Sequence, residues 1–195
     1  MRLILTTLTA AAALSLAACS NAEEAGQTGP TGDTAATPAM QETPAAGATA
    51  AQTPTDGNGY VTMAGASDLF EIQSSELALE KSQNADVREF AQMMIDHHRK
   101  TTEQVTAAAR AAGMTPPAPQ LNSMQRDMMT QLQSASGADF DRMYIDQQRQ
   151  AHQMALALHQ TYAAQGDTPQ LQEVARTAVP IIEQHITEAQ GLNAA

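Results

Sequence analysis

The spacing of apolar side chains after residue 60 predicts helices rather than strands. Between about residues 84 and 112, apolar positions recur every three or four residues, which is the period of an amphipathic helix. One face of this segment carries Val87, Phe90, Ala91, Met94, His98, Val105 and Ala109. Gly113 follows directly and suits the left-handed conformation in which many helices end. The segment is therefore predicted to be one long helix.

An earlier helix is expected to begin at Ser67, because Ser is a favoured N-cap residue and Asp68 would lie near the positive end of the helix dipole. Its expected inward face consists of Leu69, Ile72, Glu76 and Leu79. This face would place one carboxylate, that of Glu76, among apolar side chains.

Three more helices follow from the same period and from the residues that interrupt it. Three prolines between residues 116 and 119 break the chain before a short helix over 121–133, and a long helix over 138–164 comes next. The last helix is expected to begin with Thr168 as its cap and Pro169 in its first position. Pro180 lies inside that helix and is expected to kink it or to remove one backbone hydrogen bond.

Four main helices, with a longer crossover and a short extra helix after the second, describe an all-α four-helix bundle over residues 60–195. Residues 19–59 are rich in Ala, Thr, Gly and Pro, with Met40 as the only large apolar side chain. Such a segment cannot bury enough surface to offset its loss of chain entropy on ordering. It is predicted to be a disordered tether that precedes the bundle.

The first twenty residues, MRLILTTLTAAAALSLAACS, have the charged start, apolar stretch and small residues of a signal peptide over 1–18. The end of this stretch resembles a bacterial lipobox, in which Cys19 is acylated and becomes the mature N-terminus. The expected partner of the lipid is a membrane. By resemblance to enterobacterial lipoproteins, Ser20 in place of Asp favours the outer membrane, with the bundle facing the periplasm. Inner-membrane anchoring and surface exposure stay open.

Charge and composition exclude several kinds of partner. The formal net charge is −11, and binding to nucleic acid phosphates needs clustered Lys and Arg instead. Cys19 is the only cysteine, so neither a disulfide nor a cysteine zinc site can form within one chain. The sequence also lacks a phosphate loop and the nucleophile motifs of hydrolases, and therefore predicts no particular reaction.

Helical phase separates the two histidines of MMIDHHRK. At 100° per residue, His98 lies about 20° from the centre of its helix's apolar stripe and His97 about 80° from it. His185 also points inward on its own helix, about 40° from the stripe centre. His152 lies about 110° from the stripe of the 138–164 helix. It faces the core only if that helix buries a wide arc.

These positions allow one transition-metal ion, either iron, copper or zinc, to bind His98, His185 and His152 together with Glu71 or Glu76. Two alternatives involve no metal. The histidines form either a structural polar cluster that fixes helix register or a layer that senses pH. A di-iron centre is disfavoured because neither inward histidine belongs to a Glu-x-x-His motif.

Methionine supplies a further argument about the metal. Met93 and His97, like Met94 and His98, lie four residues apart, and thioether and imidazole ligands together suit copper. Packing of the core explains the eleven methionines equally well, because the chain is poor in aromatic residues.

Three blocks of sequence resemble the family of domain-of-unknown-function 4142: LFEIQSSELALEKSQNADVREFAQMMIDHHRK, FDRMYIDQQRQAHQMALALHQTYAAQGDTPQLQEVA and VPIIEQHITEAQ. The resemblance covers about residues 61–193 and implies a ferritin-like bundle in a bacterial envelope protein, with no established reaction. Matched residue by residue, it places an acid at Glu71 and histidines at His98, His152 and His185. It also puts His97 where the family has an acid.

Taken together, these features predict a lipid-anchored bundle that acts as a binding, envelope-maintenance or stress module. A metal-binding protein or enzyme that uses the histidines is the first alternative. A structural module that contacts another envelope protein is the second.

Overall fold

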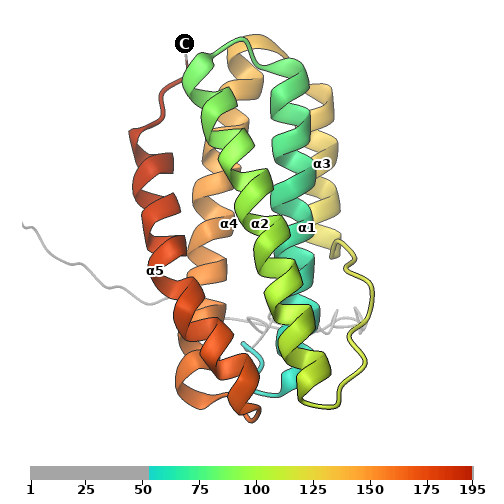
Figure 1. Ribbon diagram of the computed structural model, residues 1–195. Helices are drawn as coiled ribbons and strands as arrows, with labels where there is room; N and C mark the ends of the chain where they lie inside the picture. Colours follow the sequence, from blue (N-terminus) through green and yellow to red (C-terminus); the bar gives the residue numbers. More distant parts are fainter. Residues whose placement is uncertain (1–52, 195) are drawn as a thin grey trace, which may run out of the picture. The chain divides into compact units, whose positions relative to one another are not determined.

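Five helices make up most of residues 53–194, the part of the chain that the computed structural model describes (Figure 1). They are α1 Gly57–Lys81, α2 Ala85–Ala111, α3 Ser123–Ser134, α4 Gly137–Gln165 and α5 Pro169–Gly191. Residues 53–194 contain no strand. The predicted signal peptide, Cys19 and the tether up to residue 52 lie outside the described residues.

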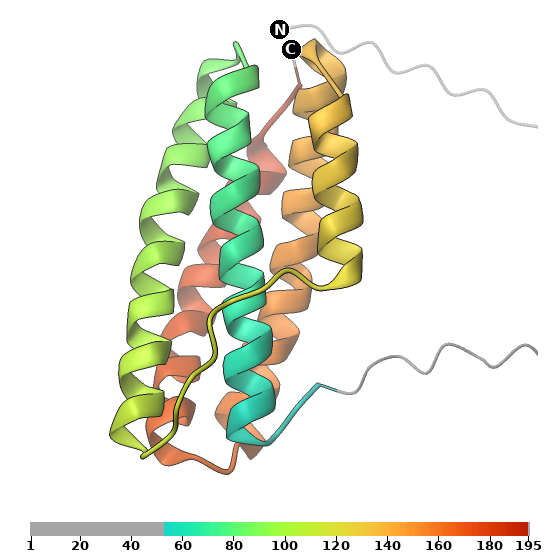
Figure 2. The same ribbon diagram turned by 90° about the vertical axis from the view of Figure 1, so that its right-hand side faces the viewer.

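The four long helices pack side by side, and the short α3 lies against them. α1 contacts α2 and α4, while α5 contacts α4 and α2, so that each long helix has two long neighbours. After α2 the chain crosses over α1 before it enters α3, and Pro119 of this crossover lies against Gly65 (Figure 2). The predicted all-α four-helix bundle with a short helix in its crossover is therefore confirmed.

α2, α3 and α4 begin and end within two residues of the predicted positions, and α5 begins one residue after its predicted cap. The side chain of Asn84 accepts hydrogen bonds from the first turn of α2, and Gly113, with φ of +79°, follows its last turn. Asn122 and Gln125 form a capping box at the start of α3. Pro169 occupies the first position of α5, as predicted.

The prediction for α1 was wrong in two respects. The helix begins at Gly57, ten residues before Ser67 and inside the expected tether, and the side chain of Asp56 caps it by accepting from the amide of Gly59 at 2.8 Å. Its buried face is also different from the apolar stripe expected, because Tyr60, Asp68 and other polar residues point inward. Two glycines in the first turn lower the helix propensity, and packing of Tyr60 against α4 outweighs that cost.

Two apolar clusters occupy the two ends of the bundle. One contains aromatic residues from three helices, Phe70, Phe90, Phe140 and Tyr144, with buried methionines and leucine around them. The other is built around Tyr60, Leu158, Tyr162 and Leu171. Between them along each helix lie buried polar side chains: Asp68, Glu71, Ser74, Ser75, His98, Gln148, His152 and His185. We call these eight residues the polar layer.

Basic side chains of α1 and α4 donate hydrogen bonds to carbonyls at the C-terminal ends of α3 and α5. Lys81 at the end of α1 donates to the carbonyl of Ala135 after α3 at 2.8 Å, and Arg149 of α4 donates to the carbonyl of Ala189 in α5 at 3.0 Å. Such carbonyls lack intrahelical donors and carry partial negative charge, so that a cation beside them is stabilising. None of the described helices is long and apolar enough to span a membrane.

Tyr60 of α1 forms a buried pair with His159 of α4, outside the polar layer and at the end of the bundle where Tyr162 and Leu171 lie. The Tyr60 hydroxyl lies 3.1 Å from His159 Nδ1, and the Tyr60 ring stacks on Tyr162 with centroids 3.9 Å apart. Burial lowers the pKa of His159 to about 4, although the charge of Asp68 acts in the opposite direction. His159 is therefore neutral in the folded protein at pH 7.

This burial makes the bundle sensitive to acid. Because the unfolded chain binds a proton at His159 with the ordinary pKa of about 6.5, this site favours unfolding increasingly as the pH falls from 6.5 towards 4. The difference is worth up to about 3 kcal/mol of unfolding free energy. In urea denaturation between pH 7 and 4, we expect His159→Gln to lose stability less steeply than the unmodified protein. Parallel pH profiles for the two proteins would contradict this expectation.

Candidate metal centre

Three histidines from three helices meet inside the polar layer. His98 comes from α2, His152 from α4 and His185 from α5, and one ring nitrogen of each lies within 4.8 Å of the other two. Their ring centroids are 5.2–5.6 Å apart, and the exposed fraction of each residue is 6% or less. The structure therefore brings together the three histidines that the sequence singled out.

Each histidine reaches this point for a reason visible along its helix. His98 and His185 lie on the apolar stripes of α2 and α5, which face the core as predicted. His152 faces the core because α4 buries a wide arc that includes Gln148 and His159. α4 can do so because it packs against both α1 and α5.

His98 is held by a carboxylate on its outer side. Its Nδ1 lies 2.8 Å from Oδ1 of Asp68, whose other oxygen accepts a hydrogen bond from the Thr102 hydroxyl at 2.9 Å. Since a carboxylate accepts, the ring proton stays on Nδ1, which leaves a lone pair on Nε2 when the ring is neutral. His98 Nε2 is buried without a hydrogen-bond partner. Metal-binding histidines characteristically show this carboxylate–imidazole arrangement.

A chain of hydrogen bonds orients the other two rings. His152 Nδ1 donates to the carbonyl of Gln148 at 2.8 Å, so in the neutral ring Nε2 carries the lone pair. That Nε2 lies 3.2 Å from Nδ1 of His185, and Nε2 of His185 lies 2.8 Å from Nδ1 of His97. The rings of His97 and His185 stack with centroids 5.1 Å apart. His97, half-buried at the edge of the bundle, thus supports His185 from outside.

Burial and neighbouring charges set the protonation of the three rings. Burial lowers the pKa of His185 to about 2, with the positive forms of nearby histidines acting in the same direction. Burial also lowers the pKa of His152, although Glu71 opposes it. For His98 burial acts to lower the pKa, but the hydrogen bond and charge of Asp68 and the charge of Glu71 outweigh it and raise the pKa. Two rings are therefore neutral, as metal ligands must be.

Glu71 adds a second buried carboxylate to the polar layer. Its exposed fraction is 1%, and Oε1 lies 3.7 Å from His152 Nδ1 while Oε2 has no hydrogen-bond partner. Glu71 does not belong to the group of ligand atoms within 4.8 Å of one another, which contains only the three histidines. Its carboxylate contributes negative charge beside them.

Glu76 does not lie in the polar layer, and the expectation that it faces the core was wrong. Its side chain is half-exposed and accepts from Arg99 at 2.9 Å on the surface. The error came from aligning the stripe of α1 on Leu69 and Ile72, which are only partly buried. The inward face is instead polar at this level of the bundle.

Sequence reasoning missed two residues that touch the site, Asp68 and His97. Asp68 was placed at a helix start, yet it lies in the middle of α1 and holds His98. A usable signal was present, since Asp68, Glu71 and Ser75 are spaced three and four residues apart, as core residues of a helix are. His97 was placed at the margin of α2, where it does lie, but its contact with His185 depends on how α5 packs.

Solved structures share this fold at low sequence identity. CopM in its Cu(II)-bound form matches with a TM-score of 0.58 and 17% identity, covering 69% of this chain and 93% of CopM. CopM in its Cu(I)-bound form matches with a TM-score of 0.57 and 18% identity, covering 69% of this chain and 92% of CopM. A DUF305 fragment from Deinococcus radiodurans matches with a TM-score of 0.56 and 20% identity, covering 68% and 93% of the two chains.

No curated protein matches the sequence. A family profile does match, over residues 41–192, and so includes all five helices. The resemblance seen in the three sequence blocks is thereby confirmed: the chain belongs to the family described as domain of unknown function (DUF4142).

Proposed function

We propose that this protein binds one transition-metal ion through His98, His152 and His185. The observation that carries the proposal is the convergence of their three ring nitrogens within 4.8 Å inside the bundle. Imidazole is the commonest protein ligand of zinc, copper and iron, and helical bundles build metal sites from facing helices in this way.

The polar surroundings of the three rings support a cation. Each proposed ligand has a hydrogen-bond partner on its outer side. Asp68 contacts His98, His97 contacts His185, and the carbonyl of Gln148 contacts His152. Asp68 and Glu71 bring two carboxylates into the core, whereas the polar layer contains no Lys or Arg. A divalent ion would balance these two charges.

A purely structural polar layer explains the site less well. Glu71 Oε2 and His98 Nε2 are buried without partners, and each such atom costs about 1–3 kcal/mol when it is left unsatisfied. A layer that only fixed helix register would gain nothing from these two atoms. A bound cation beside the three rings would satisfy His98 Nε2 directly and Glu71 through its charge.

Copper is the first ion to test. Among the divalent ions of the first-row transition metals, a given set of nitrogen ligands binds Cu²⁺ most tightly, and more tightly than Zn²⁺. The similar fold of CopM, a protein whose structures include Cu(II)- and Cu(I)-bound forms, is consistent with this choice. When bound, such an ion would supply Lewis acidity or, for copper, electron transfer. The protein's own residues hold the ligands in one orientation and exclude water from them.

The site would act at the bacterial envelope if Cys19 is lipidated. We include in the proposal that residues 1–18 are removed, that Cys19 anchors the chain to the outer membrane, and that the bundle faces the periplasm. The support is the lipobox-like sequence Leu16-Ala17-Ala18-Cys19 together with membership of the family. A binding or metal-handling role in envelope maintenance fits this location.

Metal content tests the central proposal. Protein purified without a chelator or a histidine tag, and then loaded with Cu(II) or Zn(II), should hold about one ion per chain by mass spectrometry. The pair His98→Ala/His185→Ala should hold less than about one tenth of that amount, because two of three ligands are gone. His159→Gln, which changes a buried histidine outside the group, should keep the metal. Circular dichroism checks that all proteins remain helical. Equal metal in all three, or none in the unmodified protein, would refute the proposal.

His97 supplies a second test through its contact with His185. We expect His97→Ala to weaken metal affinity about tenfold to one-hundredfold, as loss of an outer partner does, while one ion per chain still binds at saturation. Competition with a chromogenic chelator measures this affinity. Lys100→Ala, an exposed change on the same helix, is the control and should leave it unchanged. An affinity of His97→Ala within twofold of the unmodified protein would contradict the role assigned to His97.

The anchor is tested separately in cells that express the full chain. Cys19→Ala should move the protein from the membrane fraction to the soluble fraction, because a multiply acylated cysteine is the proposed attachment. Ser20→Ala is the matched control and should stay with the membrane. If Cys19→Ala also remains in the membrane fraction after a salt wash, the lipid anchor is wrong.

A further inference from the structure

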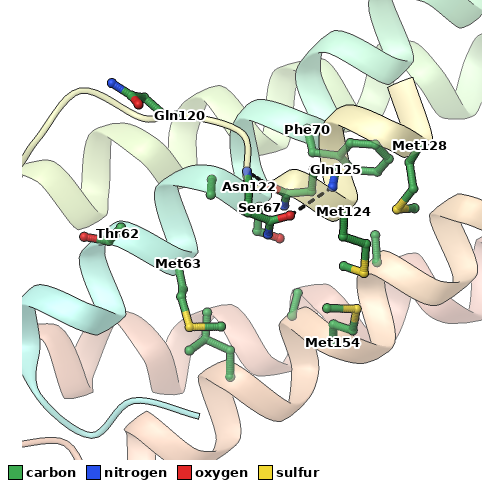
Figure 3. Close-up of a pocket in the computed structure, with 14 residues that line it drawn as sticks. Thr62, Met63, Ser67, Phe70, Gln120, Asn122, Met124, Gln125, Met128 and Met154 are labelled. Carbon is green, nitrogen blue, oxygen red and sulfur yellow. Dashed lines mark hydrogen bonds between the residues drawn. The ribbon is translucent and has the colours of Figure 1, made fainter. Parts of the chain in front are cut away.

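A second site lies on the outer side of the α1–α4 pair, beneath α3 and the crossover. The cavity there has a volume of about 290 Å³, and methionine side chains from three helices surround it (Figure 3). Met63 comes from α1, Met124 from α3 and Met154 from α4, with Phe70 and Leu158 among the other lining residues. None of the three histidines of the metal centre lines this cavity.

Exposed apolar surface of the described residues is concentrated at this cavity. Residues 53–194 contain four large apolar side chains that are exposed. Three of them, Met63, Met124 and Met154, line the cavity, with exposed fractions of 36–46%. Ile181 on α5 is the fourth. Leaving such groups together in water is unfavourable, and a concave, mostly apolar pocket with a few polar groups is the usual form of a small-molecule site.

The lining carries no formal charge. No Asp, Glu, Lys, Arg or His borders the cavity, although 16% of the chain is charged and the net charge is −11. Of the polar lining residues, Asn122 and Gln125 already bond to each other's backbone in the capping box of α3 (Figure 3). Ser67, Gln120 and the amide NH₂ groups of Asn122 and Gln125 leave a few uncharged polar groups for a ligand. A charged ligand would lose its hydration without finding an oppositely charged partner.

The volume also limits the occupant. A dry apolar cavity of about 150 Å³ is known to hold one benzene molecule, so a cavity of about 290 Å³ is large enough for roughly two fused rings or a short hydrocarbon chain. It is much larger than a metal ion needs. Methionine side chains are flexible and polarisable, and can adapt to ligands of different outline.

We infer that this cavity binds an uncharged, mainly apolar small molecule, held by Met63, Met124 and Met154 at its mouth and by Phe70 and Leu158 within. The inference is independent of the metal centre, because no ligand residue is shared. The molecule could be free or could be the hydrocarbon part of a lipid, and the two sources share the same apolar chemistry.

Fluorescence of N-phenyl-1-naphthylamine, an uncharged probe that brightens in apolar surroundings, tests the site. The full chain should bind one probe molecule saturably, and decanol should displace it. Met154→Glu should weaken binding at least tenfold, because it places a charge at the mouth. Ile181→Glu removes a similarly exposed apolar side chain elsewhere and should change binding less than twofold. Both residues are exposed, so both variants should remain helical by circular dichroism.

Two further arms separate the alternatives. Met124→Leu/Met154→Leu keeps the apolar surface but removes both sulfur atoms, and it should still bind the probe within about threefold. Loss of binding in this variant, or saturable binding of Ag⁺ without binding of the probe, would overturn the inference in favour of sulfur coordination. Neutral phosphatidylcholine vesicles that compete with the probe identify a lipid chain as the source, and decanol displacement without vesicle competition identifies a free molecule. No saturable probe binding, or an equal effect of Met154→Glu and Ile181→Glu, would also overturn it.

Discussion

The hydrogen bond between Asp68 and His98 shows the constraint on which the bundle depends, namely that polar groups placed in the core must find partners on other helices. Asp68 comes from α1 and His98 from α2, and the two atoms are 2.8 Å apart with both residues buried. A buried carboxylate without such a partner would cost several kcal/mol. The bond therefore sets the register of α1 against α2, and this register in turn decides which side chains can reach His98 from α4 and α5.

The apolar clusters on either side keep the polar layer closed. Aromatic residues of α2 and α4 fill one end of the bundle, and the stacked rings of Tyr60 and Tyr162 fill the other. Water is kept from the histidines by these clusters, and for this reason burial dominates the pKa values of His152 and His185. The same dryness makes unpartnered atoms such as Glu71 Oε2 costly, and a site of this kind suits a ligand that brings positive charge.

The two proposed sites use different faces of the same pair of helices. On the inner side of α1 and α4, Glu71 and His152 face the polar layer, and on the outer side Met63 and Met154 face the cavity. α3 and the crossover cover the outer side without closing it. One helix pair can serve two chemistries in this way because side chains three to four residues apart share a face, whereas those two apart point away from each other.

Helical period and helix-breaking and capping residues were enough to determine the all-α class, the limits of α2, α3 and α4 to within two residues, and the start of α5. These features depend on residues close together in the chain. They also predicted that His98 and His185 point inward, because both helices have a clear apolar stripe. The start of α1, the outward position of Glu76 and the contacts of Asp68 and His97 were decided only by tertiary structure. α1 packs against three helices and buries polar side chains, so its apolar residues do not mark its inner face. A contact such as that of His97 with His185 joins residues 88 positions apart and follows from the packing of whole helices, which no local pattern records.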